Sequence, residues 1–489
     1  MRLISIFLAI AVNCLAQTNL IHQAAELETA GKFKEASALL ERAMIDKTNN
    51  KPAEQKQIEF ELDRLQRIKK DFPYTRDQLF KELQNSVKDL TPAEFDQWIS
   101  EGRFDSRDID GERRFMGSSA SNLYFRYSEL EPRRIPAKTP AAFEQSIYKN
   151  CTGIEMAAMA EKTPYVLPKR FRVTMTVTAK PEAAPDGEII RAWLPIPRHY
   201  PFQNDFEFIS ASSKVRHVDG ENSPIRSIFL EQGAHQGKPT IFRIGYEYTT
   251  WGVRFNVDPS LAVATDPTDV ALKPWLTEAP HVVFTPEVRA LSAQIAGDEK
   301  NPYLKAKKFY DWIANQIKYS YAIEYSTIRN ISDYCRTKQY GDCGQEALLF
   351  ITLCRLNGIP ARWQSGWNMV PGGKTIHDWS EIYVAPWGWM PVDPYMGIYA
   401  MRYIRTLPDE QKRVIRDFYF GGLDQFRMAA NSDHNQELIP AKSSMRSDTV
   451  DFQRGELEWD GRNIYFDQYS WELTWKEIPP LKDQRNARE

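Results

Sequence analysis

The segment 340–360 constrains the fold more than any other part of the sequence. It reads Tyr-Gly-Asp-Cys-Gly-Gln-Glu, then a nearly unbroken apolar run over 347–356, then Asn-Gly-Ile-Pro. The Asn-Gly pair and the proline are typical of a helix end. Asp342 and Gln345 have the spacing of a capping box at a helix start. The segment therefore predicts a buried helix with Cys343 in its first turn.

A cysteine at a helix N-terminus can act as a nucleophile. The helix dipole and the unpaired amides stabilise a thiolate, and the same amides can stabilise an oxyanion that forms beside the sulfur. A capping carboxylate at Asp342 opposes the thiolate, so Cys343 needs a cationic partner. His377 can supply that partner or act as the base.

His377 begins a short aromatic and β-branched run, His-Asp-Trp-Ser-Glu-Ile-Tyr-Val, which predicts a strand. Because side chains alternate along a strand, one face should carry His377, Trp379, Glu381 and Tyr383. The stretch 385–388 looks like a turn, and a second short strand leads to Asp393. A three-residue loop pairs Val384 with Gly388 and puts Asp393 on the His377 face, where it can orient the imidazole.

Each of these features is weak alone, because a cysteine at a helix start, a histidine on a strand and an Asp-Pro pair are usually structural. Their order along the chain, a helix with Cys343 and then strands with His377 and Asp393, is the layout of a papain-type triad.

The blocks GDCGQEALLFITLCRLNGIPAR and HDWSEIYVAPWGWMPVDP resemble the core of the transglutaminase-like superfamily over roughly residues 280–400. The resemblance implies an α+β fold with a papain-type core, Cys343 as nucleophile, His377 as base and Asp393 as orienting acid. The complete triad argues against an inactive member. Classical cross-linking members depend on calcium, and no acidic calcium loop is evident, which weakens the cross-linking interpretation.

We expect five parts along the chain. Residues 1–16 have the positive start, apolar run and small residue of a signal peptide. Residues 17–165 read as a helical accessory domain, and 168–260 as a β-sandwich because short alternating strands follow one another. The transglutaminase-like core should span 275–400. Residues 401–489 read as a β-rich extension with an Asp-Gly hairpin turn.

The signal peptide predicts an exported protein, periplasmic or extracellular, cleaved after Ala16. Lipid anchoring through Cys14 fits poorly because Asn13 precedes it, and no later segment is long and apolar enough to span a membrane. A net charge of −2 argues against a nucleic-acid surface. The histidines show no metal-ligand spacing, so no metal or other cofactor is expected. Whether Cys151 and Cys335 pair stays open.

Four aromatic residues near the expected triad are candidates for substrate contact: Tyr340, Trp367, Trp379 and Tyr395. Glu381 could support the cleft or pair with Arg362. The predicted reaction is acyl transfer through a Cys343 thioester, with hydrolysis of a peptide, protein or peptidoglycan-like amide favoured. The alternatives are a protein-crosslinking transglutaminase, in which an amine takes the acyl group, and a non-catalytic binding module with the same fold.

Overall fold

The computed structural model describes residues 20–45, 52–136, 143–370 and 375–481. The described residues form two compact units, the first from the residues up to 136 with 320–329 and the second from 143–319 with 330–481. The expected signal peptide, 1–16, with Cys14, lies outside the described residues. In the described part of the chain, no helix combines the length and the apolar character of a membrane span.

The first unit is mainly helical. Residues 20–29 are helical, and the named elements that follow are α2 (Phe33–Ile45), α3 (Pro52–Asp71), α4 (Arg76–Gln84), α5 (Pro92–Ser100), the hairpin β1 (Ser106–Ile109) and β2 (Glu112–Phe115), α6 (Ser119–Arg126) and the 3-10 helices η1 (Ser128–Arg133) and η4 (Tyr325–Thr327). Local signals set these boundaries. At α5, for example, the Thr91 side chain accepts a hydrogen bond from the Glu94 amide, with Pro92 in the first turn.

Helix α7 (Phe143–Glu161) belongs to the second unit. Its buried residues Cys151 and Ile154 pack with Ile415 and Phe418, which lie on α13 (Asp409–Phe418). The division of the chain therefore differs from the helical domain 17–165 that the sequence predicts, because the apolar face of α7 is covered by a helix far along the chain.

Two five-stranded sheets form a sandwich in the second unit. One has the order β14-β8-β3-β18 with β5 paired to β8, and the other β17-β16-β4-β7-β6. The strands from the first half are β3 (Tyr165–Ala179), β4 (Ile189–Pro195), β5 (Gln203–Ala211), β6 (Val215–Val218), β7 (Ser227–Gly233) and β8 (Thr240–Arg254). Alternate residues of β3, among them Val173, Met175 and Val177, are fully buried between the sheets, as the alternating sequence predicts.

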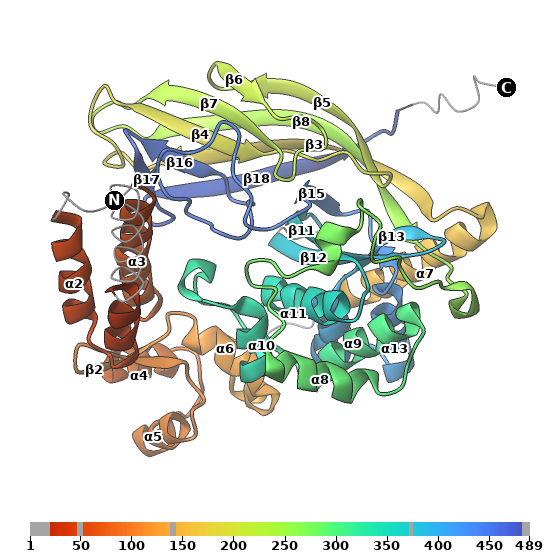
Figure 1. The fold of residues 1–489 in the computed structure, drawn as a ribbon, viewed down its shortest axis with the longest axis horizontal. Coiled ribbons are helices and arrows are strands. Elements are labelled where there is room, and N and C mark those ends of the chain that lie inside the picture. The colour runs from red at the N-terminus through yellow and green to blue at the C-terminus, as the bar shows by residue number, and fades with distance from the viewer. Residues whose placement is uncertain (1–19, 46–51, 137–142, 371–374, 482–489) are drawn as a thin grey trace, which may run out of the picture. The chain divides into compact units, whose positions relative to one another are not determined.

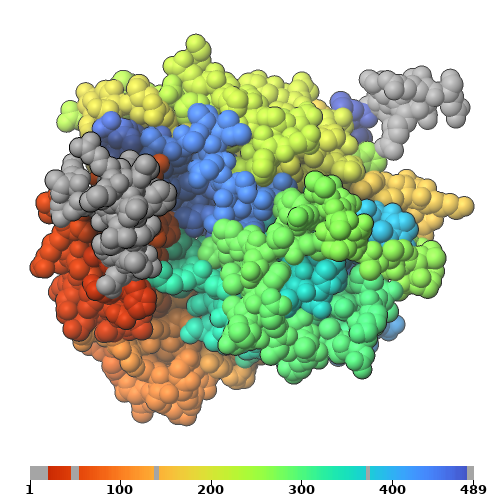
Figure 2. All heavy atoms as spheres, viewed as in Figure 1, coloured from red at the N-terminus to blue at the C-terminus, as the bar shows by residue number. Residues whose placement is uncertain are grey.

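The C-terminal strands complete this sandwich. They are β16 (Glu456–Trp459), β17 (Arg462–Ile464) and β18 (Tyr469–Ile478), with Asp460 and Gly461 at positive φ in the predicted hairpin turn. Strand β18 pairs along β3, and β16 pairs with β4. The described part of the expected extension, residues 401–481, thus does not stand apart from the sandwich and the core, and Figure 2 shows blue C-terminal atoms between yellow-green sandwich atoms and green core atoms.

A four-stranded sheet of order β13-β12-β11-β15 forms the core that positions the site. The strands are β11 (Ala361–Asn368), β12 (Thr375–Val384), β13 (Gly388–Val392) and β15 (Arg427–Asn431), with β14 (Gly422–Leu423) and the short pair β9 (Lys318–Tyr319) and β10 (Tyr340–Gly341) beside it. Helices around it are α8 (Pro286–Ala296), α9 (Pro302–Gln316), α10 (Ile331–Lys338), α11 (Cys343–Leu356), α12 (Pro394–Ile398), the π-helix η5 (Tyr399–Tyr403) and α13, with the 3-10 helices η2 (Pro259–Leu261) and η3 (Lys273–Leu276).

The core sheet lies between α11 and the sandwich (Figure 1). On the sandwich side, Trp367 and Met428 join the same buried cluster as Val173. In the hairpin of β12 and β13, Val384 pairs with Gly388, which confirms the register predicted from the three-residue loop. The predicted α+β class is confirmed.

Candidate active site

Cys343 occupies the first position of α11. Asp342 caps the helix by accepting a hydrogen bond from the Gln345 amide at 3.1 Å, and the Gln345 side chain accepts one from the Asp342 amide at 3.3 Å. This is the predicted capping box. The helix is buried from Gly344 through Arg355, so α11 is a fixed element and Cys343 stands at its half-buried end.

His377 and Asp393 are in direct contact. The His377 Nε2 atom lies 2.8 Å from Asp393 Oδ2, and both side chains are buried. Asp393 follows β13 directly and caps α12, where its Oδ1 accepts a hydrogen bond from the Met396 amide at 3.1 Å. The carboxylate is therefore fixed by the helix it caps while it holds the imidazole.

Arg427 is a second partner of Asp393. Its Nη2 atom lies 3.0 Å from Asp393 Oδ2 and 3.0 Å from Asp424 Oδ2, and the guanidinium is fully buried. Burial raises the pKa of Asp393, but His377 and Arg427 outweigh it and hold that pKa below its ordinary value. Asp393 is therefore an anion at neutral pH, as an orienting acid must be.

The Cys343 sulfur is hydrogen-bonded to Asp378 rather than to His377. Its thiol donates to Asp378 Oδ2 at 3.5 Å. Strand β13 reaches only as far as Ser380 along β12, so the edge of β12 at residue 378 is open to α11. Among the described residues, no hydrogen bond joins Cys343 to His377. The structure thus brings His377 and Asp393 together and places Cys343 against the neighbouring residue of the same strand.

The pKa values of Cys343 and His377 are both shifted toward the uncharged form of the side chain. Burial raises the pKa of Cys343, and the carboxylates of Asp378 and Asp342 raise it further. Burial lowers the pKa of His377, although Asp393 opposes that shift. A neutral thiol and a neutral imidazole follow, and a thiolate requires transfer of the thiol proton. With Nε2 engaged by Asp393, Nδ1 is the imidazole nitrogen available to receive it.

Of the four aromatic candidates for substrate contact, Tyr395 lies at the site. It is half-buried, its ring centroid lies 5.2 Å from that of His377 in an edge-on arrangement, and a second edge-on contact at 5.1 Å joins it to Tyr319. Tyr340 precedes the α11 cap on β10 and is half-buried. Both are thus within the surroundings of Cys343 and partly open to solvent.

Trp367 and Trp379 do not fit a role in substrate contact, because both are fully buried. Trp367 points to the sandwich, where its ring lies 4.9 Å from Trp471. Trp379 stacks on His377 at 5.9 Å and supports the imidazole. Glu381 pairs with Arg362 at 2.7 Å, the structural alternative that the sequence allowed.

The cysteines of the described region are all free: Cys151, Cys335, Cys343 and Cys354. Cys343 is half-buried and the other three are buried, so Cys343 is the most exposed thiol among them. Within the described ranges, no group of His, Cys, Asp or Glu side chains is arranged to hold a metal ion.

Three residues of the site were missed by reasoning from sequence: Asp378, Arg427 and Gln453. Gln453 donates hydrogen bonds to the His377 carbonyl at 3.0 Å and to Asp378 Oδ1 at 2.8 Å. Asp378 directly follows His377, but alternation along the strand assigned it to the other face. Arg427 and Gln453 come from distant segments with no local signal for this contact.

Comparisons with known proteins found a family model and relatives that match part of the chain. Residues 289–394 match the family model of the transglutaminase-like superfamily. An uncharacterised protein of Haemophilus influenzae is 22% identical over 223 residues, which make up 40% of this chain and 60% of that protein. YebA of Bacillus subtilis, also uncharacterised, is 29% identical over 130 residues, or 22% of this chain and 17% of that protein. The chain thus spans less than two thirds of either relative.

Solved structures resemble the chain more loosely. A candidate cysteine protease from Cytophaga hutchinsonii gives a TM-score of 0.41 at 16% identity, covering 65% of this chain and 94% of that one. The periplasmic domain of TgpA from Pseudomonas aeruginosa gives 0.27 at 14% identity, covering 47% and 96%. By its match to the family model, the region 289–394 is a core of the transglutaminase-like superfamily.

Proposed function

We propose that the protein is a thiol-dependent acyl-transfer enzyme that hydrolyses a peptide or amide bond through a thioester on Cys343. The observation that carries this proposal is the contact of His377 Nε2 with Asp393 Oδ2 at 2.8 Å. Asp378, the next residue along the same strand, touches the Cys343 sulfur at 3.5 Å. A base oriented by a buried carboxylate beside a thiol is the arrangement that activates a cysteine nucleophile.

In the proposed reaction the Cys343 thiol gives its proton to His377 Nδ1, and the sulfur attacks the carbonyl carbon of the substrate. Asp393 stabilises the imidazolium that results. The imidazolium then protonates the leaving amine as the carbon–nitrogen bond breaks, which leaves a thioester. Water, deprotonated by His377, attacks the thioester carbonyl and releases the acid and the free thiol.

The start of α11 can stabilise the oxyanion of this reaction. The first four amides at a helix start have no partner inside the helix, and here those of Asp342 and Gln345 each donate to the side chain of the other. The amides of Cys343 and Gly344 remain at the helix start, next to the sulfur. We assign them to the oxyanion, which a helix N-terminus also favours through its dipole.

We further propose that the enzyme acts outside the cytoplasm on a peptide or peptidoglycan-like amide. The support for export is the pattern of charged, apolar and small residues over 1–16. Cell fractionation tests this proposal: the full-length protein should leave the cytoplasm, and a variant without residues 1–16 should stay in it. Equal distribution of the two forms would contradict export.

The test of the activity is mass spectrometry of peptide and peptidoglycan-fragment libraries incubated with wild type, Cys343→Ala and, as a matched control, Cys354→Ala. Cys354 is buried on the same helix, away from the site. Products should form with wild type and with Cys354→Ala, but not with Cys343→Ala. Addition of water identifies hydrolysis, and joining of an added amine identifies transamidation. Products that persist with Cys343→Ala would overturn the proposal.

A further inference from the structure

The carboxyl of Asp378 connects the proposed nucleophile to a distant part of the chain. Its Oδ2 accepts the hydrogen bond of the Cys343 thiol at 3.5 Å, and its Oδ1 accepts one from Gln453 Nε2 at 2.8 Å. The side chain is buried, with 4% of its surface exposed. Gln453 also donates to the His377 carbonyl at 3.0 Å. Asp378 is thus fixed on one side by Gln453 and faces the sulfur on the other.

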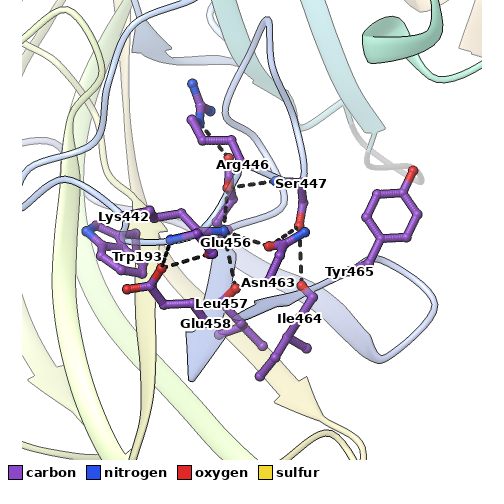
Figure 3. Close-up of polar contacts among 12 residues, drawn as sticks. Trp193, Lys442, Arg446, Ser447, Glu456, Leu457, Glu458, Asn463, Ile464 and Tyr465 are labelled. Carbon is purple, nitrogen blue, oxygen red and sulfur yellow. Dashed lines mark hydrogen bonds and ion pairs between the residues drawn. The ribbon is translucent and has the colours of Figure 1, made fainter. Parts of the chain in front are cut away.

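Gln453 is itself held in place by the segment 432–455, which is anchored on strand β16. Glu456 is the centre of this anchor (Figure 3): its Oε2 lies 3.0 Å from Lys442 Nζ, and its Oε1 accepts from Arg446 Nε at 2.8 Å. Glu458 accepts hydrogen bonds from the amides of Ser443 and Ser444. Glu456, Glu458 and Lys442 are buried, and a buried, paired network of this kind fixes geometry. The position of Asp378 is therefore built into the fold.

We propose that Asp378 regulates the Cys343 site by holding the thiol proton in the resting enzyme and keeping the sulfur from His377 until substrate is bound. This inference rests on the proposed function, because it assigns a resting state to the same nucleophile. Activation then exchanges one acceptor for another: the S–H group leaves Asp378 Oδ2 and gives its proton to His377 Nδ1. No other reactant is required.

Three carboxyl groups near the sulfur oppose a thiolate: Asp378 on β12, Glu346 on α11 and Asp342, which caps α11. The backbone amide of Asp378, which donates a hydrogen bond to the sulfur, favours the thiolate instead. The neutral ring of Tyr395 also lies near the sulfur. Asp378 in turn faces Asp342, the Cys343 thiol, and Asp448 and Asp451 of the segment 432–455, and a side-chain hydrogen bond joins it to Asp451. Arg454 acts on Asp448 and Asp451.

The Cys343 thiol and the Asp378 carboxyl are joined by a hydrogen bond, so the charge on one acts directly on the other. Burial raises the pKa of both groups. A carboxyl is ordinarily a stronger acid than a thiol by roughly 4 to 5 pH units, so we expect Asp378 to lose its proton first. The thiol must then lose its proton beside a carboxylate, so its titration moves to higher pH. Replacing Asp378 with asparagine removes that charge while keeping an oxygen for Gln453, and the thiol should titrate at lower pH.

The test is the pH profile of iodoacetamide alkylation at Cys343, followed by mass spectrometry of the peptide that contains it. In wild type the midpoint should lie above that of a free thiol, about 8.5. In Asp378→Asn it should fall by about one pH unit, which makes alkylation near neutral pH about tenfold faster because the thiolate fraction rises tenfold per unit. Asp266→Asn, which removes an exposed charge elsewhere in the same unit, should match wild type.

Two results would overturn the inference: a wild-type midpoint at or below that of a free thiol, or the same midpoint in folded Asp378→Asn as in wild type. The wild-type profile decides the first point even where the variant does not fold. The profile needs no substrate, so it is independent of the proposed hydrolysis. If Cys343→Ala loses turnover of the library while Asp378→Asn has the alkylation profile of wild type, only the role of Asp378 is refuted. If Cys343→Ala keeps the turnover while Asp378→Asn lowers the alkylation midpoint, only the proposed activity is refuted.

Discussion

His377 Nε2 and Asp393 Oδ2 lie 2.8 Å apart in the buried core of the second unit, and Asp393 carries its negative charge there because Arg427 is its second partner. This contact fixes the tautomer of the imidazole, since Nε2 must carry the proton that it shares with the carboxylate. The nitrogen that can act on a thiol is therefore Nδ1.

Asp393→Asn should abolish most of the activity. An asparagine that donates to Nε2 would force the proton to Nδ1, the wrong tautomer for a base, and the loss in a comparable triad is about 10⁴-fold in rate. Turnover of the library-derived substrate by the folded variant measures this loss. Asp409→Asn, at an exposed site in α13, is the control and should retain full activity. Activity within tenfold of wild type in Asp393→Asn would contradict an orienting role.

Arg427→Met should strongly destabilise the second unit. It leaves Asp393 and Asp424 buried without their cation, and breaking a buried pair costs about 3–5 kcal/mol. Denaturant unfolding measures the change. The control is Arg216→Met, because Arg216 pairs with Glu231 at 2.9 Å with 46% of its side chain exposed, and an exposed pair contributes under about 1 kcal/mol. Similar losses in both variants would show that Arg427 has no special role.

Gly366→Ala should disturb the site through the backbone. Gly366 pairs with His377 across β11 and β12, and a Cβ there would lie 1.8 Å from the Met428 carbonyl oxygen. Strand β15 would have to move, and with it Arg427. We expect a loss of at least about 2 kcal/mol in unfolding free energy, in the range of overpacked buried sites, together with lower turnover.

Gly153→Ala is the matched control for this change. Gly153 lies inside α7, where a Cβ meets no atom within 4 Å. Alanine is the better helix former by about 1 kcal/mol, so this variant should be as stable as wild type or more so. A Gly366→Ala protein as stable as Gly153→Ala would contradict the close approach of β11 and β15.

Asp71→Asn should stabilise the first unit at high pH. Burial, together with repulsion from Glu324, raises the pKa of Asp71 to about 7. Because the folded-state pKa lies above the unfolded one, the wild-type carboxyl contributes less stability as pH rises from about 4 to 7. The asparagine variant carries no charge at this position, so its stability does not fall in this pH range. Its side-chain oxygen can still accept the hydrogen bond that the Glu324 amide donates to Asp71 Oδ2 at 3.0 Å in wild type.

The stability difference between Asp71→Asn and wild type should therefore be near zero at pH 4 and reach about 2 to 4 kcal/mol above pH 7. Unfolding curves of both proteins across this range measure it. A difference that does not change with pH would show that Asp71 titrates normally.

Features set by neighbouring residues could be predicted from the sequence. The capping box of Asp342 and Gln345, the end of α11 at Asn357 and the pairing of Val384 with Gly388 each depend on a few adjacent residues. The approach of His377 to Asp393 followed from that pairing, because side-chain direction alternates along a strand.

Features set by long-range packing could not be predicted from the sequence. Strand β11 is buried on both faces, so no alternation showed that Trp367 points to the sandwich. Asp378 and the Cys343 sulfur meet because β13 ends early, at Val392. Arg427 and Gln453 reach the site from segments whose own sequences give no sign of it.

Acylation of Cys343 by an N-acetyl amino acid p-nitrophenyl ester, followed by intact mass spectrometry, measures directly whether His377 activates the sulfur. The ester needs no protonation of its leaving group, so the rate reports how His377 activates the sulfur. We expect one acyl group on wild type, none on Cys343→Ala, and acylation of His377→Ala slower by at least about 100-fold, the lower range for general-base catalysis. Acylation of Cys343 in His377→Ala at the wild-type rate would contradict the role of His377 as the base.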